Sequence, residues 1–100
     1  MKYLEKETDF QNLINQERIL VDFYADWCAP CRMISPILEA MSNERSDLSI
    51  IKVDVDEFPN IARQYGVMTI PTLIYFKEGK IVKQNIGYIE KEEIQELISD

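Results

Sequence analysis

The sequence predicts one α/β domain over residues 1–100, with a mixed sheet of about five strands flanked by four helices. Its 46% hydrophobic and 29% charged residues give an ordinary globular balance for a single domain. Apolar runs alternate along the chain with stripes of helical spacing, in the order βαβαβα followed by ββα. The first part requires parallel crossovers and the second an antiparallel hairpin, and a mixed sheet covered on both faces satisfies both.

In the first half of the chain, the expected strands are short apolar runs with few polar interruptions, as is typical of strands buried on both faces. We expect a short edge strand over 2–5 and two such buried strands over 19–25 and 48–55. Between the first two, Thr8 is expected to cap a helix. The inner face of this helix would carry Phe10, Leu13 and Ile14.

A longer helix is predicted from about Ala29 to Met41, because apolar residues recur there at helical spacing. The resulting core stripe consists of Met33, Ile34, Ile37, Leu38 and Met41. Pro36 lies within this stretch, removes one backbone donor and should kink the helix.

Proline and glycine mark the remaining elements. Pro59 fits the first position of a third helix, and Gly66 fits the residue just past its end. Strands over 72–77 and 80–86 flank a short Glu-Gly turn and predict a hairpin. A last helix is expected over 90–98, and its start should be poorly capped because glutamate is not a favoured N-cap residue.

Composition excludes several classes of site. The chain has no histidine and two cysteines, which rules out Ser-His-Asp and Cys-His catalysis and leaves too few ligands for a Cys/His zinc site in a monomer. The net charge of −7 argues against nucleic-acid and anionic membrane partners. The longest apolar run, Leu73–Phe76, is far shorter than the ~20 residues that span a bilayer. With charged residues starting near the N-terminus and no signal-peptide pattern, we expect a cytoplasmic protein.

Cys28 and Cys31 stand after a predicted buried strand, at the predicted start of a helix. The pair can close a disulfide within one turn. Unpaired N–H groups and the helix dipole favour negative charge at Cys28, and such settings lower a thiol pKa from ~8.5 into the ~3.5–7.5 range. Pro30 has no N–H to lose there and stiffens the turn. An easily formed thiolate beside a second thiol is what dithiol exchange requires.

Other interpretations of the Cys-x-x-Cys spacing are open at this point. The thiols could be packed core residues, half of a metal site or a structural disulfide. Metal binding needs ligands that one chain does not have, although a dimer could supply four thiolates for an iron–sulfur cluster. Structural disulfides are rare in the cytosol, and closing so short a loop stabilises little. The redox interpretation is therefore favoured.

Asp22 and Lys52 each interrupt an otherwise apolar predicted strand. Burying a lone charge is costly, and a nearby opposite charge lessens the cost. If neighbouring strands carry them, the two side chains can pair or share water beneath the cysteines. A buried carboxylate has a raised pKa, which suits a proton acceptor for Cys31. The alternative is that either side chain reaches solvent at a strand end.

Several separated motifs follow one another in an order that identifies a family. They are the stretch VDFYADWCAPC at 21–31, Pro36, Lys52, the Ile-Pro-Thr at 70–72 and Gly87. With them the chain resembles the thioredoxin family over nearly its whole length, least clearly before Ile19. The resemblance implies the thioredoxin fold.

The resemblance also implies an enzyme, a protein dithiol–disulfide oxidoreductase with a Cys-Ala-Pro-Cys active site, a mixed-disulfide intermediate and neither metal nor bound cofactor. Cys28 would be the attacking thiolate and Cys31 the more buried resolving thiol, with Asp22 and Lys52 assisting proton transfer. The Ile70–Pro71 bond would be cis and would face the cysteine pair. The substrate-binding surface would comprise Trp27, Ala29, Pro30, Ile70, Pro71 and Gly87. The chain departs from the commonest family residues at Tyr24, Ala29, Arg32 and Thr69.

The implied partners are a thioredoxin reductase, a flavoprotein using NADPH, and disulfide-containing clients such as reductases and peroxidases. We expect a monomer that serves in electron transport and cell redox homeostasis. Reduction is favoured because no histidine stands between the cysteines, as it often does in strong oxidants of this fold. The rival hypothesis is a binding module that scaffolds an assembly and whose cysteines are incidental.

Overall fold

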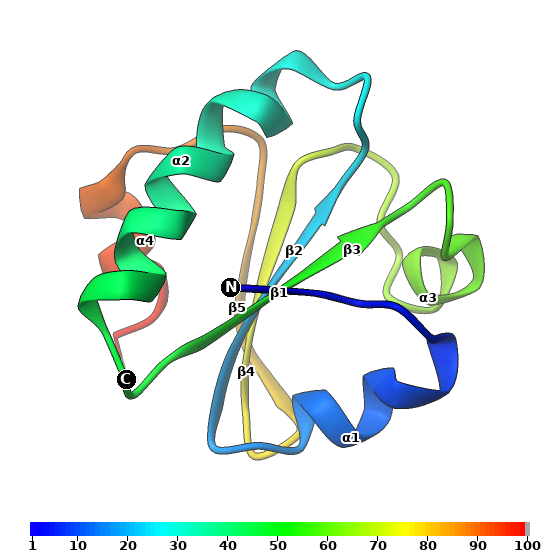
Figure 1. Cartoon of the computed structure of the whole chain (residues 1–100), viewed down its shortest axis with the longest axis horizontal. Coiled ribbons are helices and arrows are strands. Elements are labelled where there is room, and N and C mark those ends of the chain that lie inside the picture. The colour runs from blue at the N-terminus through cyan, green and yellow to red at the C-terminus, as the bar shows by residue number, and fades with distance from the viewer. Residues whose placement is uncertain (100) are drawn as a thin grey trace.

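The computed structural model describes residues 1–99 and shows a five-stranded mixed sheet between two pairs of helices (Figure 1). The strands are β1 (Lys2–Tyr3), β2 (Arg18–Tyr24), β3 (Ser49–Asp54), β4 (Thr72–Lys77) and β5 (Lys80–Ile86). The helices are α1 (Phe10–Ile14), which follows a 3₁₀ turn, α2 (Ala29–Glu44), α3 (Pro59–Gln64) and α4 (Lys91–Leu97). The strand order β1-β3-β2-β4-β5, parallel up to β2 and antiparallel beyond it, confirms the predicted mixed sheet.

Each face of the sheet has its own hydrophobic core, and the strands alternate between them. Helices α1 and α3 cover one face, while α2 and α4 cover the other (Figure 1). Along β2, Val21 and Phe23 pack toward α1 and α3, whereas Leu20 packs toward α2 and α4. Because side chains alternate with a period of two, Asp22 points to the same face as Leu20. The same parity places Lys52 of β3 on that face, beneath α2.

The hairpin and the third helix form as predicted. Strands β4 and β5 have the expected bounds, and the turn residues Glu78 and Gly79 have φ angles of 54° and 83°. Positive φ at both positions is what a two-residue hairpin turn matched to strand twist requires. Pro59 begins α3, and Gly66 follows its end with φ of 67°. Helix α2 runs to Glu44, beyond the predicted end, and the kink expected at Pro36 stays a prediction.

The prediction that Met33 belongs to the core stripe is wrong, because 61% of its surface is exposed. The buried residues of α2 are Cys31, Ile34, Leu38 and Met41. With 3.6 residues per turn, Met33 is rotated by about 100° from Ile34 and falls outside this stripe.

Two predictions about helix capping are also wrong. Thr8 does not cap α1, because a 3₁₀ turn over Glu7–Asp9 precedes the helix and Thr8 lies within it. The start of α4 is better capped than expected, because the Glu93 carboxylate accepts a hydrogen bond from the Glu90 backbone N–H at 3.2 Å. This is one half of a capping box, which satisfies a donor that glutamate at the N-cap would otherwise leave free.

Candidate active site

The cysteine pair lies at the start of α2, just after the loop that connects β2 to this helix. Cys28 is the N-cap residue of α2, with extended backbone angles (φ −87°, ψ 111°), and Pro30 lies in the first turn. The Cys28 N–H donates to the Ala25 carbonyl at 3.2 Å, which closes the turn after the strand. The Cys31 N–H donates to Cys28 Sγ at 3.3 Å. Cys28 Sγ is therefore held at the end of a helix where backbone donors favour negative charge.

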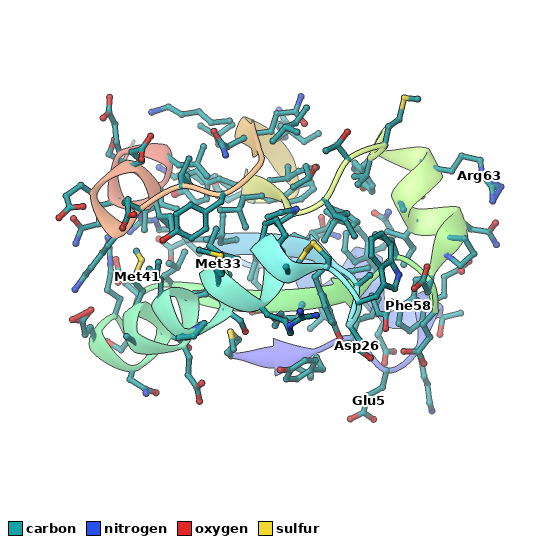
Figure 2. The ribbon with its side chains drawn as sticks, turned by 90° about the horizontal axis from the view of Figure 1, so that it is seen from above. Glu5, Asp26, Met33, Met41, Phe58 and Arg63 are labelled. Carbon is teal, nitrogen blue, oxygen red and sulfur yellow. A yellow bond between two sulfur atoms is a disulfide. The ribbon has the colours of Figure 1, made fainter. Side chains whose placement is uncertain are left out.

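The two cysteines form a disulfide at the N-terminal end of α2 (Figure 2). Their Cα atoms are 5.2 Å apart, within the ordinary range for a disulfide. Both residues are nearly buried, with 4% of Cys28 and 2% of Cys31 exposed, so the burial difference that the family implies is small. The pair can thus exist as a bonded disulfide, which dithiol exchange requires.

The loop before β4 faces the cysteines, as the family resemblance implies. The Ile70–Pro71 peptide bond is cis, and the Ile70 carbonyl oxygen lies 3.8 Å from Cys28 Sγ. The Gly87 N–H donates to the Pro71 carbonyl at 2.8 Å, which ties the end of β5 to this loop. Ile70 and Gly87 are half-buried, whereas Pro71 is buried. The structure thus brings Cys28, the cis-proline loop and Gly87 together.

Trp27 directly precedes Cys28 in the chain, and 69% of its surface is exposed. Its indole N–H donates to Asp56 Oδ2 at 2.9 Å, which orients the ring. The following Ala29 and Pro30 are also exposed. Sequence analysis did not single out three further exposed residues: Asp56, which binds the indole, Met68, two residues before Ile70, and Ile86, which directly precedes Gly87. Asp56 lies in an ordinary acidic run, and only the fold places it beside the indole.

Asp22 and Lys52 form a buried ion pair across β2 and β3. They are register partners in the parallel ladder, and Lys52 Nζ lies 3.4 Å from Asp22 Oδ2. Asp22 is fully buried and Lys52 is 4% exposed, which rejects the alternative that either side chain reaches solvent at a strand end. Burial raises the pKa of Asp22 to about 6, and attraction to Lys52 offsets part of that rise.

A surface hollow of about 190 Å³ reaches both the lysine of this ion pair and the second cysteine. Cys31, Ser35 and Lys52 line it together with five neighbours: Tyr3, Tyr24, Ala25, Asp26 and Arg32. The hollow is large and polar enough to admit water. The buried Lys52 and the second cysteine, Cys31, therefore line the same hollow.

Within residues 1–99, no group of three or more histidine, cysteine, aspartate or glutamate side chains is placed to hold a metal ion. No helix in the same range is long and apolar enough to cross a membrane.

Comparison with known proteins relates the whole chain to one family. A family model described as thioredoxin matches residues 1–100. The thioredoxin of Chlamydia trachomatis is 42% identical over 99 residues, which cover 99% of this chain and 97% of that protein.

Solved structures show the same relationship. A Plasmodium falciparum thioredoxin superposes with a TM-score of 0.90 at 31% identity, over 98% of this chain and 96% of that one. A second solved structure concerns the thiol resolving mechanism of yeast mitochondrial 1-Cys peroxiredoxin via glutathione and thioredoxin systems. One of its chains superposes with a TM-score of 0.89 at 34% identity, over 98% of this chain and 92% of that one. With a disulfide-forming Cys-x-x-Cys at the start of α2 and a family match over its full length, the chain belongs to the thioredoxin family of disulfide oxidoreductases.

Proposed function

We propose that the protein reduces disulfides of other proteins by cycling between a Cys28–Cys31 dithiol and disulfide. The observation that carries this proposal is the position of Cys28 at the N-cap of α2. Its Sγ accepts the Cys31 N–H there and lies within bonding reach of Cys31 Sγ. The same N–H and the helix dipole stabilise a Cys28 thiolate once the disulfide is reduced.

The exchange takes two steps. The Cys28 thiolate attacks one sulfur of the client disulfide, so that a Cys28–client bond forms and the other client sulfur leaves as a thiolate. Cys31 then loses its proton, and its thiolate attacks Cys28 Sγ. The Cys28–Cys31 bond forms and the second client sulfur is released. Two electrons pass from the dithiol to the client, which ends as two thiols once its sulfurs take up protons.

Asp22 is the proposed acceptor of the Cys31 proton. A carboxyl with a pKa of about 6 is mostly ionised near neutral pH yet is more basic than an exposed aspartate. Lys52 lines the same hollow as Cys31 and keeps the ionised Asp22 from being an unpaired buried charge. Proton transfer would use the hollow, through water between these groups.

The proposed client surface surrounds Cys28. Trp27, Ala29 and Pro30 would contact the client on one side, and Ile70 and Gly87 on the other. Three observations support this surface: the exposure of Trp27, Ala29 and Pro30, the partial exposure of Ile70 and Gly87, and the 3.8 Å distance from the Ile70 carbonyl oxygen to Cys28 Sγ. The ring of Pro71 is buried, so it would act by shaping the loop.

The proposed partners follow from the family. Thioredoxins act on disulfide-containing substrates and are regenerated by reductases, so we propose a flavoprotein thioredoxin reductase with NADPH as electron donor. Reductases and peroxidases are the proposed clients, and the likeness to a chain studied with a 1-Cys peroxiredoxin supports the peroxidases. We further propose a monomeric single domain that works in the cytoplasm for electron transport and redox homeostasis, since a dithiol reductant needs a reducing compartment.

Insulin reduction by dithiothreitol tests the proposed activity. The wild type should accelerate insulin precipitation, and Cys28→Ser should reduce the rate to that of dithiothreitol alone because no attacking thiolate remains. A Ser46→Ala variant in an exposed turn, far along the chain from the cysteines, controls for handling and should match the wild type. Equal rates for the wild type and Cys28→Ser would favour the rival binding module.

A further inference from the structure

The ammonium group of Lys52 lies near the side-chain oxygens of two residues, Ser35 and Asp22. It donates a hydrogen bond to Ser35 Oγ at 2.9 Å, whereas its distance to Asp22 Oδ2 is 3.4 Å. Charge-assisted N–H···O bonds are about 2.7–2.9 Å long, so the closer of the two contacts goes to the neutral serine. Neither Asp22 carboxylate oxygen has a hydrogen-bond partner among residues 1–99, although both are buried. The ion pair is therefore held at incomplete contact.

Two aromatic rings complete the surroundings of this ammonium. Lys52 Nζ lies 4.3 Å from the centroid of the Tyr24 ring and 5.6 Å from that of Tyr3. The two rings meet edge to face with centroids 6.1 Å apart. Distances within about 6 Å allow cation–π attraction, which stabilises the ammonium without adding a hydrogen-bond acceptor. Among residues 1–99, the structure thus shows one hydrogen bond from Lys52 Nζ, to Ser35 Oγ, and one ion-pair contact, to Asp22 Oδ2.

Ser35 lies on α2 one turn after Cys31, and the two residues line the same hollow. A serine inside a helix commonly bonds back to a carbonyl one turn earlier. Here the hydroxyl oxygen accepts a hydrogen bond from the Lys52 side chain of β3. The contact therefore links the helix that carries both the N-cap cysteine and Cys31 to the strand that carries Lys52.

We propose that Ser35 is a positioning residue for the second exchange step. Its hydroxyl holds the Lys52 ammonium short of full contact with Asp22, which keeps the Asp22 carboxylate basic enough to take the proton of Cys31. This inference rests on the proposed role of Asp22 as the proton acceptor. In the proposed exchange the Ser35 hydroxyl contacts neither the client nor a cysteine sulfur. Ser35 acts through Lys52.

Removal of the hydroxyl leaves the ammonium with Asp22 as its remaining oxygen acceptor. A closer Lys52–Asp22 contact stabilises the ionised carboxylate, so the pKa of Asp22 falls below its value of about 6. The other titratable or charged groups around the pair come from β1, β2, the turn after β2, the start of α2 and the end of β3. They are Tyr3, Tyr24, Asp26, Cys28, Cys31, Arg32 and Asp54. Ser35→Ala leaves all of them in place.

The test is an NMR titration of the Asp22 carboxyl carbon in the oxidised protein, in which the cysteines do not titrate. Ser35→Ala should lower the Asp22 midpoint by about one pH unit, on the scale that an opposite charge shifts a carboxylate. Ser35→Thr keeps a hydroxyl and should restore the wild-type midpoint. Ser42→Ala is the matched control on α2, because its hydroxyl accepts from the Met1 amino group at 2.8 Å, away from Lys52.

An Asp22 midpoint in Ser35→Ala that is unchanged or higher would overturn the proposal, as would a threonine variant that behaves like the alanine variant or an equal shift in Ser42→Ala. The titration requires no client, so it is independent of the exchange activity. Release rates from a mixed disulfide, compared over pH for wild type and Asp22→Asn, test the role of Asp22 separately. Failure of Ser35 as a positioning residue can therefore be told apart from failure of Asp22 as the acceptor.

Discussion

Replacing Cys31 with serine should turn the protein into a trap for its clients. The first step needs only the Cys28 thiolate and should proceed, whereas the second lacks its nucleophile. Client release should therefore slow on the order of 10³-fold or more, the scale seen when a catalytic nucleophile is removed. Reduced Cys31→Ser mixed with insulin should accumulate a covalent adduct at Cys28, visible by mass spectrometry without reductant.

The reciprocal variant is the control for this experiment. Cys28→Ser retains Cys31, which lies inside the first turn of α2 rather than at its N-cap. It should form no adduct under the same conditions. Adducts at Cys31 in that variant, or undiminished turnover by Cys31→Ser, would reverse or refute the proposed division of roles.

Replacing Asp22 with asparagine should stabilise the fold in a pH-dependent manner. Burial raises the pKa of Asp22 from 3.8 to about 6, so between these pH values the unfolded chain releases a proton that the folded chain keeps. The wild type therefore loses stability as the pH rises through this window, by about 3 kcal/mol once both states are ionised. Asparagine does not ionise and escapes the loss. Since the raised pKa already includes attraction to Lys52, the figure is net of the lost ion pair.

Urea unfolding at several pH values measures this effect. Asp22→Asn should exceed the wild type in unfolding free energy by roughly 1–3 kcal/mol at pH 8, and the difference should shrink toward zero near pH 4. A difference that is constant with pH would show that Asp22 does not carry a raised pKa in the folded state.

The same substitution should slow the second exchange step near neutral pH, because asparagine cannot accept the Cys31 proton. Stopped-flow fluorescence of Trp27, the single tryptophan, can follow release from a mixed disulfide between pH 5 and 9. The wild-type rate should fall on the acid side near pH 6, and this limb should be absent in Asp22→Asn. Superimposable pH profiles would exclude Asp22 as the acceptor.

Local patterns in the sequence were sufficient to predict the order of elements and the position of the cysteine pair. The alternation of side chains along a strand explains why Asp22 and Lys52 lie on the same face of the sheet. Each follows a residue of the α2/α4 core by two positions and must therefore point to the same side. The cis Ile70–Pro71 bond rested on family resemblance alone, because most X-Pro bonds are trans.

The contacts around Lys52 could not be predicted from the sequence, for a physical reason. Ser35, Tyr3 and Tyr24 meet at Lys52 from three different elements, and nothing in their spacing encodes that meeting. Met33 was misplaced because apolar character alone does not fix the angular limit of a helix stripe. The sequence also does not predict that Asp56 accepts the hydrogen bond of the Trp27 indole, because Asp56 lies within a run of acidic residues.

The central claim is that the N-terminus of α2 holds Cys28 as a thiolate, and alkylation of the reduced protein tests it most directly. Iodoacetamide modification is followed over pH, and mass spectrometry assigns each modified cysteine. Cys28 should react first, with a midpoint at or below about pH 7.5, whereas Cys31 should lag behind. A Cys28 midpoint at the ~8.5 of an unperturbed thiol, or faster modification of Cys31, would contradict the account.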